Sequence, residues 1–159
     1  MAEPQANDTN AVVRKLREWD ASAVAEVIEF RGETTVVVPR GELRRVSDYL
    51  VSEPSLQFSF LSDITTVDKF PIEPRFEVNY HLLSLHRGER LRLKVRVPSS
   101  DVRVPSVTSV WPTANWHERE NFDLFGVRFD GHPDLTRILL PDEWEGYPLR
   151  KDYPVEGYR

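Results

Sequence analysis

The chain has 159 residues, a charged fraction of 30% and a formal net charge of −5. This length suits one domain with its own hydrophobic core. The acidic balance argues against a nucleic-acid partner, because binding phosphates requires a clustered excess of basic residues. The sequence contains no cysteine, which excludes disulfides, thiolate zinc sites and cysteine-ligated iron–sulfur clusters from this chain.

The sequence carries no targeting or nucleotide-binding signal. Residues 1–10, MAEPQANDTN, are polar and are predicted to form a disordered lead-in without the apolar stretch of a signal peptide. No apolar run approaches the roughly 18–20 residues that span a bilayer, so we expect membrane association only through a partner. Glycine-rich nucleotide loops and nucleophile motifs are also absent. We therefore expect no catalytic, cofactor-binding or metal-binding residues in this chain.

The first half of the chain alternates between helical and strand periodicity. An amphipathic helix is predicted from Ala11 to Asp20, and strands follow at Val24–Phe30 and Thr34–Val38. Arg31-Gly32-Glu33 between these strands is typical of a hairpin turn. A second helix is predicted from Gly41 to Ser52.

Three further strands are predicted at Phe58–Thr66, Arg75–Ser84 and Arg90–Val97. The last two should pair as an antiparallel hairpin with one buried face, made of Phe76, Val78, Tyr80, Leu91, Leu93 and Val95. The order helix, two strands, helix, three strands predicts a two-layer α+β sandwich with its helices on one face of the sheet. We assign this domain to residues 11–126.

A basic stripe is predicted on the opposite face of the last strand, at Arg90, Arg92, Lys94 and Arg96. The favoured interpretation is a solvated face paired with carboxylates such as Glu77 on the neighbouring strand. A partner contact or the steering of an anionic ligand is the alternative.

Prolines recur at short intervals after Val97 and exclude long helices or strands. One helix still fits, from Trp116 to about Phe125. Asn115 is its predicted N-cap, Glu118 would complete a capping box, and Gly126 would close the C-terminus.

Charged and aromatic residues alternate around the whole circumference of this helix. A short surface helix with solvated carboxylates is one interpretation. The favoured one is burial between the domain and a partner or the C-terminal segment. Glu118, Arg119 and Glu120 would then form ion pairs, because unpaired buried charges are costly.

The segment 127–159 is predicted to be ordered but irregular, and to dock on another protein. It is rich in large apolar residues that a small domain has little surface to bury. We expect it to contribute little to the domain core. Its charged cluster Arg150-Lys151-Asp152 is flanked by prolines, which suits display on a stiff docking loop.

Histidines offer a weak alternative interpretation. His117-Glu118 resembles the start of a zinc-binding H-E-x-x-H helix, but position 121 is Asn, so the second ligand is missing. His132 is interpreted as a loop histidine held by hydrogen bonds beside Pro133.

The stretch WHERENFDLFGVRFDGHPDLTRILLPDEWEGYPLRKDYP, residues 116–154, closely resembles the distinguishing motif of the C subunit of NADH:quinone oxidoreductase, respiratory complex I. The matching elements are E-R-E at the helix start, D-L-F-G at its end, G-H-P-D-L, R-I-L with a following proline, W-E-G-Y-P and L-R-K-D-Y. The resemblance assigns a docking or structural role to Glu118, Arg119, Glu120, Asp123, Phe125, Gly126, His132, Pro133, Arg137, Trp144, Pro148, Arg150, Lys151, Asp152 and Tyr153.

The resemblance implies a non-catalytic assembly subunit of the peripheral arm. It also implies packing on the D subunit, the quinone-site subunit, which lines the quinone pocket. It further implies a peripheral position on the cytoplasmic side of the bacterial inner membrane. Flavin and iron–sulfur clusters would reside on partner subunits, with none in this chain. The sequence stops five residues after Pro154, where many members continue, which indicates a short form.

Three other interpretations remain open at this point. The chain can also be the equivalent subunit of a ferredoxin- or F420-linked quinone or phenazine reductase, or of a membrane-bound hydrogenase, because the electron-input module lies on other chains. A free-standing metal-dependent hydrolase would need convergent His and carboxylate ligands. A generic interaction module would leave the long match after Trp116 unexplained.

Overall fold

The structure, a computed structural model, describes residues 10–158. The predicted lead-in over residues 1–10 lies outside this range except for Asn10. Asn10 is the N-cap of helix α1 (Ala11–Trp19), and its side chain accepts a hydrogen bond of 2.8 Å from the backbone N–H of Val12.

Five strands form the main sheet, in the order β1-β2-β5-β4-β3. Their bounds are β1 Glu26–Phe30, β2 Glu33–Val37, β3 Phe60–Asp68, β4 Phe76–Ser84 and β5 Glu89–Val97. Neighbouring strands are antiparallel except β2 and β5, which are parallel. Strand β3 therefore forms one edge of the sheet and β1 forms the other.

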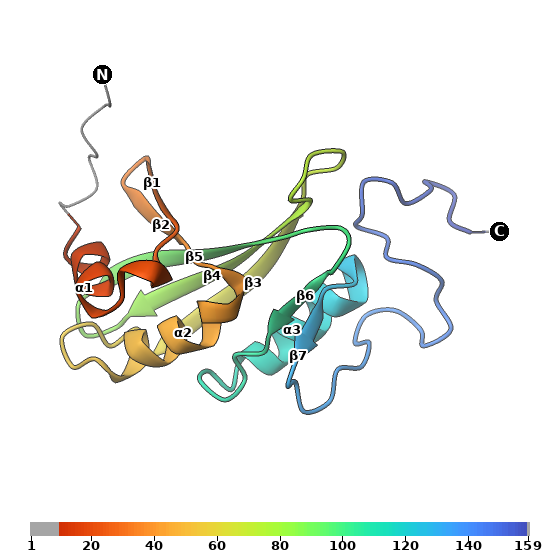
Figure 1. Ribbon diagram of the computed structural model, residues 1–159. Helices are drawn as coiled ribbons and strands as arrows, with labels where there is room; N and C mark the ends of the chain where they lie inside the picture. The colour runs from red at the N-terminus through yellow and green to blue at the C-terminus, as the bar shows by residue number, and fades with distance from the viewer. Residues whose placement is uncertain (1–9, 159) are drawn as a thin grey trace, which may run out of the picture.

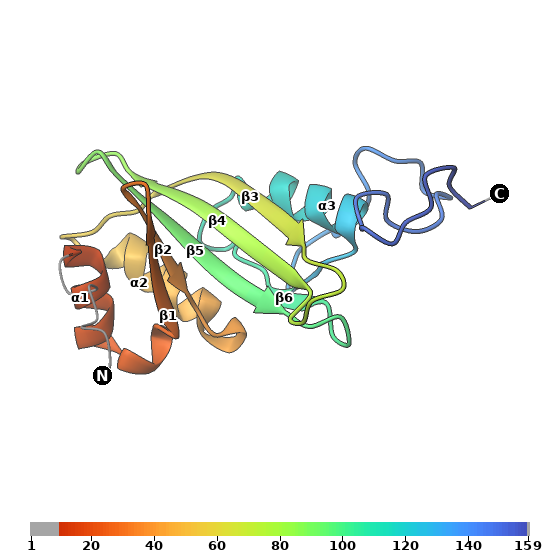
Figure 2. The same ribbon diagram turned by 90° about the horizontal axis from the view of Figure 1, so that it is seen from above.

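The helices cover one face of this sheet. Helix α2 (Leu43–Ser52) and helix α3 (Ala114–Phe125) lie beneath it in Figure 1, and α1 lies at the β1–β2 end, as the view from above in Figure 2 also shows. Two single 3₁₀ turns, η1 (Ala21–Ala23) and η2 (Arg40–Glu42), complete the first half of the chain. This arrangement confirms the predicted two-layer α+β class.

The β4–β5 hairpin has the predicted faces. Tyr80 pairs with Leu93 and Val78 with Val95, and all four side chains are buried. On the opposite face, the carboxylate of Glu77 lies 2.9 Å from the ammonium of Lys94. The predicted pairing of the basic stripe with Glu77 is confirmed, but Glu77 is buried and Lys94 is half-buried, so this pair is not a solvated one.

The β1–β2 turn also follows the sequence pattern. Arg31 and Gly32 both have positive φ, 52° and 79°. Two central residues of this kind define the two-residue hairpin turn whose twist matches that of the flanking strands.

A second, two-stranded sheet was not predicted. Strand β6 (Arg103–Pro105) pairs in parallel with β7 (Arg128–Asp130). Each has only three residues, too few for a periodicity to be visible in the sequence. Val127 and Phe129 beside and within β7 are buried in the core cluster, so the expectation that residues from 127 onward contribute little to the core was wrong for these two.

Candidate protein-docking surface

Helix α3 begins earlier than the sequence predicted. It starts at Ala114, and Thr113 at the N-cap position makes no capping hydrogen bond with its side chain. The predicted N-cap at Asn115 and the capping box with Glu118 were therefore wrong. The predicted C-terminus is confirmed, because Gly126 adopts the left-handed conformation with φ of 74°.

Gly126 is required for a second reason. A Cβ atom at this position would lie 2.5 Å from a ring carbon of Tyr147 and 2.7 Å from Nη2 of Arg150. The C-terminal segment thus packs directly on the end of α3.

Helix α3 reverses the usual distribution of polar and apolar residues. Its buried members after the first residue, Ala114, are Glu118, Asn121 and Asp123, whereas Trp116 is 64% exposed. A surface helix of a soluble domain normally turns its apolar stripe inward. Here the buried polar residues are held by hydrogen bonds, Phe125 packs partly buried against the core, and Trp116 is the aromatic residue of the helix that faces outward.

Glu118 is fully buried and serves as an acceptor for the loop before the helix. Its carboxylate accepts hydrogen bonds of 2.7 Å from the hydroxyl of Ser106 and 2.7 Å from the backbone N–H of Val107. Burial raises its pKa to about 7, and the two hydrogen bonds act in the opposite direction.

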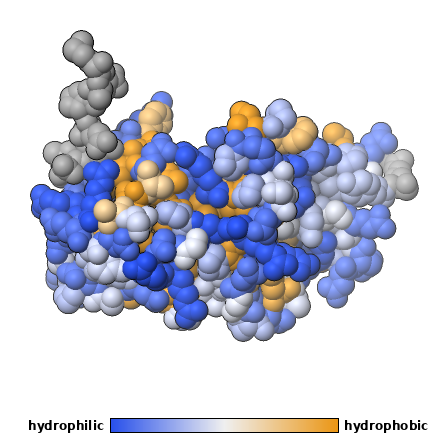
Figure 3. Space-filling view, viewed as in Figure 1, coloured by the Kyte–Doolittle hydropathy of each residue, from blue (hydrophilic) through white to orange (hydrophobic). Residues whose placement is uncertain are grey.

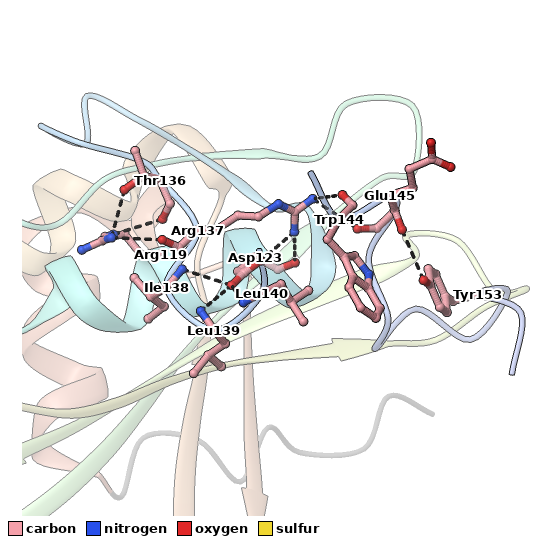
Figure 4. A network of polar contacts seen from close by, with 11 residues as sticks. Arg119, Asp123, Thr136, Arg137, Ile138, Leu139, Leu140, Trp144, Glu145 and Tyr153 are labelled. Atoms are coloured by element: carbon pink, nitrogen blue, oxygen red, sulfur yellow. Dashed lines mark hydrogen bonds and ion pairs between the residues drawn. The ribbon is translucent and has the colours of Figure 1, made fainter. Parts of the chain in front are cut away.

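Asp123 binds the segment that follows β7, as Figure 4 shows. One carboxylate oxygen lies 2.6 Å from Nη1 of Arg137. The other accepts hydrogen bonds from three consecutive backbone N–H groups, those of Ile138, Leu139 and Leu140. Burial would raise the pKa of Asp123, but these hydrogen bonds hold it below its ordinary value.

Arg119 binds the same segment from the adjacent turn of the helix. Its guanidinium donates to the carbonyls of Thr136 and Arg137 and to the Thr136 hydroxyl (Figure 4). It also lies over the ring of Trp116, with 5.2 Å to the centroid. The predicted ion pairs of Glu118 and Arg119 were therefore wrong within the described residues, because both bind hydrogen-bonding groups of nearby loops instead.

Arg150 fastens the last part of the chain to the domain. Its Nε donates a hydrogen bond of 2.7 Å to the carbonyl of Phe125, and its guanidinium lies over the rings of Phe76 and Tyr147. The side chain is therefore turned toward its own domain, and its predicted display on a docking loop is corrected.

Arg75 forms the second attachment of the C-terminal segment to the domain, because two carboxylates share its guanidinium. The side chain of Arg75 pairs with Asp68, at 2.8 Å, and with Asp152, at 2.6 Å. Asp68 also accepts from the backbone N–H of Lys151. Burial would raise the pKa of Asp68, but hydrogen bonds from Arg75, Lys151 and Phe70 lower it to about 2.

Asp68 and Arg75 were absent from the predicted site. Asp68 is the last residue of β3 and Arg75 immediately precedes β4, whereas their partners Lys151 and Asp152 lie about eighty positions later. No local pattern links residues so far apart in the sequence.

The other predicted positions have structural contacts or lie open. His132 is held as predicted: its Nε2 lies 3.2 Å from the carbonyl of Asn115, and its Nδ1 accepts from the backbone N–H of Asp134. Tyr153 donates to the carbonyl of Glu145. Pro133 is exposed and Pro148 is half-buried.

Apolar residues reach the surface around the fastened segment. Trp116 is 64% exposed, Leu139 60%, Leu149 49% and Trp144 40%, and Val155 and Tyr158 near the end of the segment are also exposed. Phe70 and Ile72 in the β3–β4 loop are about half exposed. Figure 3 shows hydrophobic residues at the surface near the β3–β4 loop and near the segment after β7. Such apolar surface on a small domain is typical of protein contacts.

Two features are absent from the described residues. Within residues 10–158 no group of three or more His, Asp and Glu side chains is placed to hold a metal ion. No helix in the same range is long and apolar enough to cross a membrane.

The fold, helix α3 and the fastened C-terminal segment define a small α+β protein with exposed apolar residues around its C-terminal segment. A family model described as the 30 kDa subunit of the respiratory-chain NADH dehydrogenase matches residues 36–159. The chain belongs to this family, that of the C subunit of NADH-quinone oxidoreductase, which is part of the peripheral arm of complex I.

Curated relatives agree along most of the chain. The C subunit of the NADH-quinone oxidoreductase of Geobacter sulfurreducens is 48% identical over 151 residues, covering 94% of this chain and 92% of the relative. The protein of the same name from Roseiflexus sp. is 47% identical, and the match covers 93% of this chain and 85% of the relative.

Solved structures share the fold. A trypsin-resistant fragment of Nqo5 is 37% identical, with a TM-score of 0.65, and the match covers 77% of this chain and 97% of the fragment. A chain of the membrane-bound sulfane sulfur reductase, an archaeal respiratory membrane complex, is 29% identical, with a TM-score of 0.77, over 91% of this chain and 84% of the other.

Proposed function

We propose that this chain is a non-catalytic assembly subunit that packs on the quinone-site subunit in the peripheral arm of a proton-translocating NADH:quinone oxidoreductase. It would support electron transfer to quinone by holding that subunit in place, from a peripheral position on the cytoplasmic side of the membrane. The apolar surface left by the reversed helix α3 and the segment fastened to it is the observation that carries this proposal.

The physical argument concerns which groups of α3 are already engaged. Glu118 and Asp123 are occupied by contacts inside the chain, so they are unavailable for chemistry on a substrate. Trp116, Leu139 and Leu149 remain at the surface. Tryptophan is among the residue types that contribute most to interface affinity.

The proposal includes the absence of any cofactor in this chain. A sequence without cysteine has no thiolate to ligate an iron–sulfur cluster, and it has no dinucleotide-binding loop. Electrons would therefore pass through partner subunits.

The test is affinity purification of the tagged full-length chain from membranes in mild detergent, followed by cross-linking and mass spectrometry. We expect co-purification of the NADH- and flavin-binding subunits, with cross-links from α3 and residues 127–158 to the quinone-site subunit. Recovery of the chain alone, or cross-links that avoid the quinone-site subunit, would contradict the proposal.

The same experiment separates the second candidate. The likeness to a chain of the sulfane sulfur reductase favours an equivalent role in a related respiratory complex as the alternative. Co-purification of a homologue of the quinone-site subunit without NADH-binding subunits would favour that alternative.

A further inference from the structure

Two exposed apolar side chains after β7 stand on backbone that buried groups hold in place. Leu139 is 60% exposed and Trp144 is 40% exposed. The backbone N–H groups of Leu139 and of its two neighbours donate to the fully buried carboxylate of Asp123. Arg137, which lies 2.6 Å from the same carboxylate, donates to the carbonyl of Trp144 at 3.0 Å (Figure 4). We call residues 138–145 the anchor loop.

This arrangement suits the anchor loop to binding a surface. A loop that is already held in one conformation loses less conformational entropy on binding than a flexible one. Tryptophan is also among the residue types that contribute most to interface affinity. Leu139 and Trp144 are therefore candidates for the side chains that enter a partner.

The surface of the anchor loop is acidic. Asp142, Glu143 and Glu145 are exposed, and their carboxylates have no hydrogen bond or ion pair within residues 10–158. Residues 138–149 contain no lysine or arginine. Each of the three acidic residues is within two positions of Trp144, so its Cα atom lies within about 8 Å of that of the tryptophan. Because the Debye length in physiological salt is also about 8 Å, the three charges act together on whatever contacts Trp144.

The two arginines that flank residues 138–149 do not offset these charges at the surface. The guanidinium of Arg137 donates to Asp123, and that of Arg150 donates to the carbonyl of Phe125. Both arginines are turned toward the domain and are half-buried. Glu120 on α3 is also half-buried, and its carboxylate has no hydrogen bond or ion pair within residues 10–158, so the ion pair predicted for it is not formed inside the chain.

We infer that the anchor loop docks into an apolar pocket of a partner protein whose rim carries lysine or arginine. The charge of the loop decides between two kinds of apolar partner. An anionic lipid surface attracts basic segments and would repel these carboxylates. A basic protein surface attracts them and steers the approach of the loop. The inference rests on the proposed function, because it assumes that the chain docks in the complex, and it adds the chemistry of the surface that receives it.

The first experiment neutralises the loop without changing its size. Asp142→Asn, Glu143→Gln and Glu145→Gln are combined in one chain. Unfolding of the free chain should be unchanged, because these carboxylates have no partner among the described residues. Recovery of the variant by co-purification of the full complex should fall about tenfold or more, because the attraction to the rim is lost.

A matched pair of charge reversals controls for net charge. Glu143→Lys and Asp48→Lys change the net charge equally, and Asp48 is an exposed carboxylate on α2 without a partner among the described residues. Glu143→Lys should reduce recovery, and Asp48→Lys should not. If wild type co-purifies and the neutralised loop is recovered equally well, the inference fails while the proposed function stands. If wild type itself does not co-purify, the proposed function fails.

A chemical readout requires no substitution. A carbodiimide with glycine ethyl ester labels accessible carboxylates. Asp142, Glu143 and Glu145 should be labelled in the free chain and lose most of this labelling in the intact complex, whereas Asp48 should be labelled in both. Equal labelling of the three loop carboxylates in both states would overturn the inference.

The lipid alternative is tested with the free full-length chain and vesicles of phosphatidylglycerol and phosphatidylethanolamine. In a flotation experiment the chain should remain in the vesicle-free fraction, because like charges repel at this surface. Flotation of the chain with the vesicles that Trp144→Ala abolishes would assign the anchor loop to a lipid surface and overturn the inference.

Discussion

Arg75 and Asp152, 77 positions apart in the sequence, form a two-pronged ion pair that holds the C-terminal segment against the β3–β4 connection. The guanidinium nitrogens lie 3.0 and 2.6 Å from the two carboxylate oxygens. The same guanidinium holds Asp68, whose side chain is fully buried. The three residues therefore join an edge of the sheet to the end of the chain.

Arg75 and Asp152 should contribute unequally to the free energy of unfolding. Arg75→Ala leaves the Asp68 carboxylate buried without its cation, and we expect a loss of about 3–5 kcal/mol in the free energy of unfolding. Asp152→Ala removes a carboxylate that is 45% exposed, so solvent screening should limit the loss to about 1 kcal/mol. Denaturant unfolding of both variants checks this order. Equal losses would show that Asp68 does not depend on Arg75.

The network also predicts that the folded protein loses stability in acid. The folded-state pKa of Asp68 is about 2, below the ordinary 3.8, so its contribution is present above about pH 4 and is lost as the pH falls toward 2. Asp68→Asn should therefore flatten the loss of stability over that interval. Unfolding of wild type and variant measured between about pH 2 and 5 is the test, and parallel curves would contradict it.

Glu118 should have the opposite pH dependence. Its folded-state pKa is raised from 4.5 to about 7, so its stabilising contribution is complete below about pH 4.5 and is lost between about pH 4.5 and 7. One pKa unit corresponds to ~1.4 kcal/mol, so the loss amounts to a few kcal/mol. Glu118→Gln should remove this slope. The difference between the two proteins isolates Glu118 from His81, whose pKa is lowered from its ordinary value by burial.

Substitution of Gly126 should destabilise the protein more than substitution of a glycine of similar backbone conformation. Gly126→Ala imposes a left-handed alanine and a clash with the Tyr147 ring, whereas Gly131→Ala, with φ of 86°, meets no atom within 4 Å. Backbone strain alone costs about 1–2 kcal/mol. Gly126→Ala should lose more than Gly131→Ala in thermal unfolding, and the excess measures the packing of the C-terminal segment. Equal losses would mean that Tyr147 moves aside freely.

Substitutions of Arg150 and Trp144 should have different effects, the first on folding and the second on docking. Arg150→Ala removes contacts with Phe125, Phe76 and Tyr147, so it should lower the melting temperature of the free chain. The Trp144 side chain is 40% exposed, and the hydrogen bonds of this residue are made by its backbone. Trp144→Ala should therefore leave melting nearly unchanged and reduce recovery in the complex. Unfolding of the free Trp144→Ala chain would place this residue in the core instead.

Local periodicity was sufficient to predict most of the domain. The alternation from Leu91 to Val97 predicted both faces of β5, because successive strand residues point to opposite sides. Arg31-Gly32-Glu33 between two strand-like runs predicted the hairpin, and Gly32 supplies one of its two positive-φ positions. The docking and structural motif over residues 116–154 was likewise recognisable from its letters, although its role in docking stays a prediction.

The contacts of the charged residues in that motif could not be predicted in the same way. Glu118 was expected at a helix cap or in an ion pair, and it binds Ser106 and Val107 because the preceding loop folds back over α3. Arg150 was expected to face a partner, and it lies over Phe76 of a strand much earlier in the chain. Strands, turns and family membership were readable from the amino-acid order, since they depend on neighbours along the chain. Long-range hydrogen bonds depend on which loops meet in space, and that is settled only when the whole core packs.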